Sequence, residues 1–138
     1  MRDPLFRMAL VLGLLSAVGP FAIDMYLPAL PEVARDLDTS EAGAALTLTA
    51  YFLVFGLAQM IYGPMADALG RKRPLMIGVG IFSIATIAAS LAPTLGWLIA
   101  ARAVQGLGAA ALMAVPRAVI RDMAAGPAAA LMMAAIMI

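Results

Sequence analysis

The sequence predicts an all-α protein, a polytopic bundle of transmembrane helices, and three observations support this fold class. Of the 138 residues, 64% are hydrophobic and 12% are Asp, Glu, Lys or Arg, whereas soluble domains carry about 25% charged residues. The mean hydropathy is +1.01. The charged residues also divide the chain into apolar runs of about 20 residues, the length that a helix needs to cross a bilayer. These properties exclude an ordinary soluble domain, a disordered segment and a nucleic-acid-binding protein.

Four membrane spans follow from the positions of the charges, Pro and Gly. We predict them at about residues 7–30, 42–66, 74–92 and 96–121. The third and fourth are separated at residues 92–96 (APTLG), because Pro and Gly close together favour a turn. A fifth apolar run starts at Pro127 and reaches Ile138 after a rise of only about 18 Å, which is too short to cross the bilayer. We therefore expect residues 1–138 to be a fragment that stops inside a helix.

Both ends of the first span can be interpreted in two ways. Its start resembles either a signal peptide or a membrane helix, and the prolines near its end either stop or break the helix. Arg2 and Arg7 precede its apolar stretch, as in a secretory signal peptide. The stretch is long and equally apolar segments follow it, so we interpret it as a membrane helix that stays in the protein. Pro28 and Pro31 near its end either simply stop the helix or break it beside Asp24, where a site could admit water.

Lys and Arg are distributed unequally between the two sides of the predicted bundle. One side carries Arg2, Arg7, Arg71, Lys72, Arg73, Arg117 and Arg121. The other side carries only Arg35, among several acidic residues. Because basic loops stay on the cytoplasmic side, we expect a cytoplasmic N-terminus and an outward-facing loop at residues 31–41. Thr39 or Ser40 should cap the second span, with Glu41 in its first turn.

Two ionisable residues, Asp24 and Arg102, fall within apolar spans. At the centre of a membrane helix each would cost about 2.5–3.5 kcal/mol, so such residues usually face a bundle interior or a wet cavity. Both lie about 9 Å below the predicted outer boundary, and their spans run antiparallel. If the two helices are neighbours, the two charges can meet or share a cavity. The alternative is that Arg102 reaches up to the interface and that water at the outer edge solvates Asp24.

Small residues follow Arg102 and predict close helix packing. Gln105 lies one turn after Arg102, and the next residues, 106–110, read GLGAA. Small residues at this spacing let another membrane helix approach. We therefore expect Arg102 and Gln105 on a packed interior face of the fourth span.

The segment between the second and third spans combines glycines, an acid and a basic run. Gly63 and Gly70 would permit a tight reversal of the chain. Asp67 lies near a helix C-terminus, where an anion is disfavoured, so it requires a basic partner; the candidates are Arg71, Arg73 and Arg121. Simple anchoring on the cytoplasmic side explains the basic run but does not explain Asp67.

The residues that the chain lacks also limit its chemistry. The sequence contains no Cys and no His, which excludes disulfides, thiolate nucleophiles and imidazole bases, and we expect no metal site. Only Asp67 and Asp122, both near the membrane surface, could supply carboxylate chemistry. We therefore predict that the chain is not an enzyme.

Three stretches resemble signatures of the major facilitator superfamily, specifically its drug:proton antiporters of the bicyclomycin/chloramphenicol-resistance (Bcr/CflA) type. Residues 19–31 (GPFAIDMYLPALP) resemble the first-helix motif of that branch. Gly63-x-x-x-Asp67-x-x-Gly70-Arg71-Lys72 is similar to the loop motif of the superfamily, although Ala68 stands where a basic residue is common. Arg102-x-x-Gln105-Gly106-x-Gly108 resembles the fourth-helix motif of proton-coupled exporters. The family has twelve spans in two halves, whereas this chain holds four and part of a fifth.

The resemblance implies proton-coupled efflux of small hydrophobic drugs by alternating access, driven by a proton gradient without a cofactor. It implies a location in the inner membrane. The expected partners are the lipid bilayer, protons, a drug-like substrate and the missing C-terminal helices. We expect no nucleic-acid partner. The proton or substrate pathway would comprise Asp24, Tyr26, Arg102 and Gln105. The cytoplasmic gate would comprise Gly63, Asp67, Gly70, Arg71, Lys72 and Asp122. The alternative is a complete small membrane protein with four helices, either a dimeric multidrug exporter or an assembly subunit.

Overall fold

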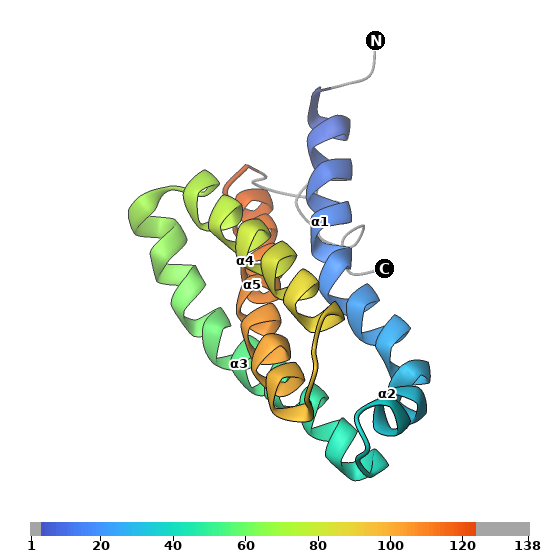
Figure 1. Cartoon of the computed structure of the whole chain (residues 1–138). Helices are drawn as coiled ribbons and strands as arrows, with labels where there is room; N and C mark the ends of the chain where they lie inside the picture. Colours follow the sequence, from blue (N-terminus) through green and yellow to red (C-terminus); the bar gives the residue numbers. More distant parts are fainter. Residues whose placement is uncertain (1–3, 124–138) are drawn as a thin grey trace.

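The computed structural model describes residues 4–123, and these residues form helices and short connections. The helices are α1 (Pro4–Tyr26), the 3-10 turn η1 (Leu27–Ala29), α2 (Leu30–Asp36), α3 (Glu41–Leu69), α4 (Lys72–Ser90) and α5 (Leu95–Met123) (Figure 1). Within this part of the chain, four helical segments are long and apolar enough to cross a membrane. This confirms the predicted all-α, multi-span fold class. The predicted fifth run at 127–138 lies outside the described residues.

The first span is longer than predicted, and most of the expected 31–41 loop is helical. One candidate span covers Phe6–Asp36, and only residues 37–40 connect α2 to α3. The two prolines occupy first-turn positions, Pro28 in η1 and Pro31 in α2, where a missing N–H costs no hydrogen bond. The backbone therefore changes from an α-helix to the 3-10 turn η1 and back to an α-helix in α2, and the first span continues to Asp36.

The start of α3 agrees with the prediction, and one glycine near its end does not. Ser40 is the N-cap, and its hydroxyl accepts a hydrogen bond from the Gly43 N–H at 3.0 Å. Gly70 ends α3 with a φ of +81°, a conformation that glycine adopts readily. Gly63 does not take part in the reversal, because it lies inside α3. Without water in the bilayer the helix continues through Gly63 and Pro64, although Pro64 has no N–H to donate.

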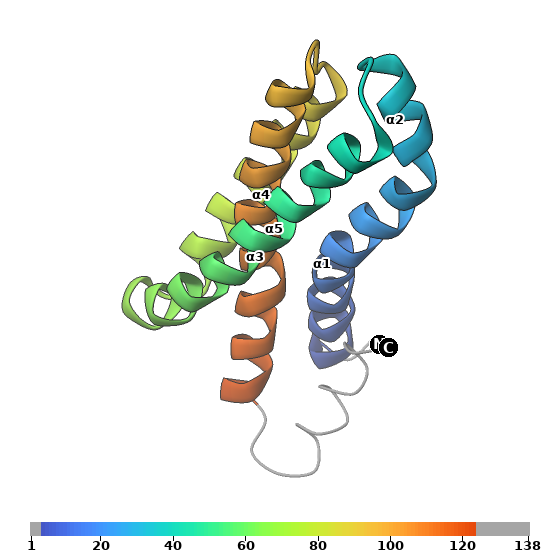
Figure 2. The same cartoon turned by 90° about the horizontal axis from the view of Figure 1, so that it is seen from below.

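Helix α5 is the centre of the described bundle. It packs against α3, α4 and α1. Among the other long helices, α1 packs chiefly against α5. In the rotated view of Figure 2, α3, α4 and α5 lie together, and α1 stands apart from them over much of its length. A Cβ at Gly106 would collide with the backbone of Tyr51 in α3, and a Cβ at Gly108 would collide with the backbone of Phe82 in α4. The predicted close packing of the glycine-rich stretch is therefore present on two sides of α5.

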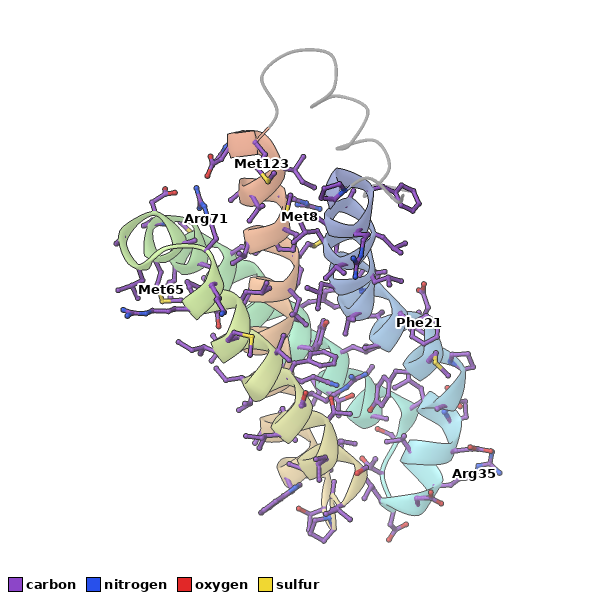
Figure 3. All side chains as sticks on the ribbon, turned by 90° about the horizontal axis from the view of Figure 1, so that it is seen from above. Met8, Phe21, Arg35, Met65, Arg71 and Met123 are labelled. Carbon is purple, nitrogen blue, oxygen red and sulfur yellow. The ribbon has the colours of Figure 1, made fainter. Side chains whose placement is uncertain are left out.

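The connection between α3 and α4 lies at the opposite end of the bundle from α2 (Figure 1). Figure 3 shows Arg71 near the end of α5 marked by Met123, at the same end as Met8, and Arg35 at the opposite end. The arrangement follows from the alternating direction of the four spans. It places the basic loop and the start of α1 on one side, as the distribution of Lys and Arg predicts.

Candidate functional site

Arg102 is a charged side chain buried among membrane-spanning helices. Its exposed fraction is 3%, so it does not reach up to the interface. The guanidinium carbon lies 3.6 Å from the centre of the Tyr26 ring and 5.5 Å from the centre of the Tyr51 ring. Aromatic faces attract a cation more strongly when both are withdrawn from water. Helices α1 and α3 therefore stabilise the charge that α5 carries.

A chain of polar side chains orients the Arg102 guanidinium. Arg102 Nη1 donates to Gln105 Oε1 at 2.5 Å, and Gln105 Nε2 donates to Thr86 Oγ1 at 2.9 Å. Thr86 donates its own hydroxyl proton to the Phe82 carbonyl at 2.7 Å. The Thr86 oxygen is thus left as an acceptor, which fixes the Gln105 amide with its oxygen toward the guanidinium. The sequence points to Gln105, one turn after Arg102, but not to Thr86 on α4.

Tyr26 is held in place by a hydrogen bond to α3. Its hydroxyl lies 2.7 Å from Thr47 Oγ1, and Thr47 donates to the Ala44 carbonyl at 2.6 Å. The proton of Thr47 is therefore in use, so Tyr26 is the donor. A second link joins α3 to α1, because the Tyr51 hydroxyl donates to the Gly19 carbonyl at 3.4 Å.

Arg102 lines a cavity of about 260 Å³ between the first span, α4 and α5. The lining residues are Tyr26, Val33, Thr86, Ala89, Ser90, Leu98, Arg102 and Gln105. Two nitrogens of Arg102, Nε and Nη2, are buried without a hydrogen-bond partner. None of the salt bridges among residues 4–123 involves Arg102. The site is a cationic, partly polar pocket at membrane depth, and we call it the Arg102 pocket.

Asp24 lines a different pocket from Arg102. That pocket of about 250 Å³ is lined by Gly19, Pro20, Ile23, Asp24, Phe52, Phe55 and Met113. Residues two apart on a helix point about 200° away from each other. Helix α1 therefore presents Tyr26 to the guanidinium and directs Asp24 elsewhere. Of the predicted pathway residues, the structure brings Tyr26, Arg102 and Gln105 together and places Asp24 apart.

A second charged cluster ties the basic end of the bundle together. Arg71 Nη2 lies 2.8 Å from Asp67 Oδ1 and 2.6 Å from Asp122 Oδ2, and Arg71 Nε donates to Asp122 Oδ2 at 3.1 Å. The hydrogen bond to Asp122 is the main cause that raises the pKa of the Arg71 guanidinium above its usual value. We call these three residues the Arg71 cluster. It links the end of α3, the start of α4 and the end of α5.

The other residues of the predicted gate lie around this cluster. Gly70 immediately precedes Arg71, and its positive φ allows the reversal. Lys72 is exposed at the start of α4, and Gly63 lies away from the turn inside α3. Among the described residues, no group of three or more acidic side chains could hold a metal ion.

Comparison with known proteins identifies the relatives of the chain. The sequence model of the Major Facilitator Superfamily matches residues 12–138. The MFS-type transporter YdgK of Bacillus subtilis is 41% identical over 119 residues, 86% of this chain. Multidrug resistance protein D of Escherichia coli K12 is 39% identical over 117 residues (85%), and a Bicyclomycin resistance protein homolog of Haemophilus influenzae is 36% identical over 118 residues (86%). The chain spans 30% of the length of each of these relatives.

Proposed function

Because the chain belongs to the Major Facilitator Superfamily, we propose that it forms the N-terminal part of a proton-coupled exporter of small hydrophobic drugs. Two relatives are named for multidrug and bicyclomycin resistance, which supports export of drug-like molecules. The distribution of Lys and Arg supports an inner-membrane protein with its N-terminus in the cytoplasm. The energy source is the proton gradient, and no cofactor is required.

The observation that carries this proposal is the burial of Arg102 within a membrane span, at a pocket shared by three helical segments. A charge at this depth is costly and marks a transport pathway more often than a structural contact. Arg102 belongs to α5, whereas Tyr26 and Asp24 belong to α1. A relative movement of α1 and α5 therefore changes the surroundings of the guanidinium.

Such a movement couples substrate exchange to protons. Asp24 is the candidate proton carrier, because it is an acidic residue within an apolar span, and its distance from Arg102 differs between two arrangements of α1 and α5. In alternating access these two arrangements belong to the two states of the transporter.

The Arg71 cluster serves as a gate at the cytoplasmic end. It joins the α3–α4 connection to the end of α5 through contacts of 2.8 Å and 2.6 Å. These contacts hold the cytoplasmic ends of three helices together and favour the state that is open to the outside. Opening toward the cytoplasm requires that they break.

The test uses the complete protein that contains this chain, expressed in a drug-sensitive bacterial host. Asp24→Asn and Arg102→Ala should each abolish drug resistance while the amount of protein in the membrane stays unchanged. Arg117→Gln, which removes another arginine of α5, should keep resistance. Wild-type resistance in both Asp24→Asn and Arg102→Ala would remove these residues from the mechanism.

A further inference from the structure

The charge of Arg102 has no salt-bridge partner among the residues that the structure describes. Residues 124–138 contain no acidic residue in the sequence. A buried cation without an anion is strongly destabilising, so the site favours an anionic ligand.

The geometry of the guanidinium suits a carboxylate. A guanidinium carries five N–H donors in one plane, and the structure records one hydrogen bond from them to another side chain, to Gln105. The guanidinium carbon lies 3.6 Å from the Tyr26 ring centre, and Nε and Nη2 have no hydrogen-bond partner, so these two neighbouring donors are available to a ligand. A planar carboxylate accepts two hydrogen bonds side by side, which a neutral amide cannot match in strength.

The walls of the Arg102 pocket indicate what is attached to that carboxylate. Val33, Ala89 and Leu98 form an apolar surface, while Thr86 and Ser90 add hydroxyl groups. An occupant of the 260 Å³ cavity therefore needs an apolar body as well as one charged group.

A neighbouring cavity gives the occupant a route to the outer end of the bundle. This cavity of about 200 Å³ shares Val33, Ala89, Ser90 and Leu98 with the Arg102 pocket, and it extends to Asp36 and the connections that follow α2 and α4. The two cavities share these four residues as a common wall, and we call the two together the groove. The carboxylate of Asp36 repels anions, and it disfavours a dianion about twice as strongly as a monoanion.

We propose that the Arg102 pocket binds small amphiphilic monocarboxylates, with the carboxylate on Arg102 and the apolar body against Val33, Ala89 and Leu98. The proposal deepens the proposed export function and rests on it, because it names one class of exported substrate. Thr86 and Gln105 keep the guanidinium in the orientation that receives the carboxylate.

The test measures direct binding of benzoate and of its neutral isostere benzamide to the purified complete protein by calorimetry. Benzoate should bind at least about tenfold more tightly than benzamide, because only the carboxylate forms charged hydrogen bonds. Arg102→Gln should remove this difference, whereas Arg117→Gln, on the same helix, should keep it.

A second variant leaves the arginine intact in case Arg102→Gln does not fold. Ala89→Phe fills the pocket from α4 and should weaken benzoate binding about tenfold or more. Equal binding of benzoate and benzamide, or wild-type benzoate binding by Arg102→Gln or Ala89→Phe, would overturn the proposal. Binding requires no transport, so this result is independent of the resistance assay that tests the export function.

Discussion

Arg71 and Arg102 are two arginines of one chain in opposite surroundings. Arg71 lies at the end of the bundle and contacts two carboxylates, Asp67 and Asp122, whose side chains are 62% and 50% exposed. Arg102 lies inside the bundle, is 3% exposed, and contacts two aromatic rings and an amide. The arginine at the end of the bundle has two acidic partners, and the buried arginine has none among residues 4–123.

This difference separates a structural contact from a candidate binding site. Exposed ion pairs contribute only about 0.2–1 kcal/mol each, because water competes for both partners. A buried charge without a counter-ion costs much more and persists where function requires it. In the proposed mechanism the Arg71 cluster shifts the balance between two states, whereas the Arg102 pocket binds the transported species.

Arg102→Lys should have the largest effect, because it keeps the charge and removes the planar donors. A lysine has no planar group to place over the Tyr26 ring and cannot hold two parallel bonds to a carboxylate. We expect the drug-efflux rate in proteoliposomes to fall about a hundredfold, from the loss of charged hydrogen bonds and of the cation–π contact. Arg117→Lys should retain the wild-type rate. A rate for Arg102→Lys within twofold of wild type would show that only the charge matters.

Thr86→Val should reduce the efflux rate about tenfold, because it leaves the Gln105 amide without its acceptor. The released amide can then turn and present N–H groups to the guanidinium. Thr86→Ser should restore the rate, since serine supplies the same oxygen. Thr49→Val is the matched control, because Thr49 bonds only the Ala45 carbonyl of its own helix. If Thr86→Val and Thr86→Ser behave alike, the hydroxyl does not position Gln105.

Asp122→Asn should change the efflux rate about threefold and the free energy of unfolding by less than about 1 kcal/mol, the range of exposed ion pairs. Addition of 1 M salt to the wild type should approach the same rate, since it screens exposed charges. Asp38→Asn, at the opposite end, is a suitable control because asparagine tolerates the positive φ of Asp38. A hundredfold fall in the efflux rate of Asp122→Asn would show that the Arg71 cluster matters as much as Arg102, which contradicts the difference proposed between them.

Tyr26→Phe should have the smallest effect, about twofold on the rate, because the ring over Arg102 remains. The variant loses only the bond to Thr47, whose hydroxyl still donates to the Ala44 carbonyl. Tyr26→Leu, which removes the ring, should lower the efflux rate clearly more than Tyr26→Phe does. Equal rates in the two variants would show that the aromatic face does not stabilise the guanidinium.

The sequence predicted those parts of the fold that depend on local chemistry. The lengths of the apolar runs gave the four spans, Ser40 was predicted as one of two possible N-caps, and the residues after Arg102 predicted close packing. The prediction of a loop at residues 31–41 was wrong, because Pro28 and Pro31 fall in first-turn positions that helices accept. The prediction that Gly63 takes part in the chain reversal was wrong, because a membrane helix tolerates a Gly-Pro pair that would favour a turn in water.

The site depends on how the helices are rotated against one another, which single-chain patterns do not determine. Arg102 and Gln105 were identified because they share one helix turn. Thr86 was missed because its contact depends on the packing of α4 on α5. The same rotation brings Tyr26, rather than Asp24, to the guanidinium. The pathway and gate roles of these residues stay predictions until the variants are measured.

The central claim, that water and solutes reach the Arg102 pocket, is tested most directly by cysteine accessibility in a cysteine-free version of the complete protein. Ala89 lines the pocket, and Ile87, which is 61% exposed, points about 200° away on the same helix at nearly the same depth. A charged, membrane-impermeant thiol reagent reacts with the ionised thiol, which forms in water. Ala89→Cys should react at least about tenfold faster than Ile87→Cys, by the difference in thiolate population. Equal, slow reaction at both positions would show that the groove is dry and would contradict the account.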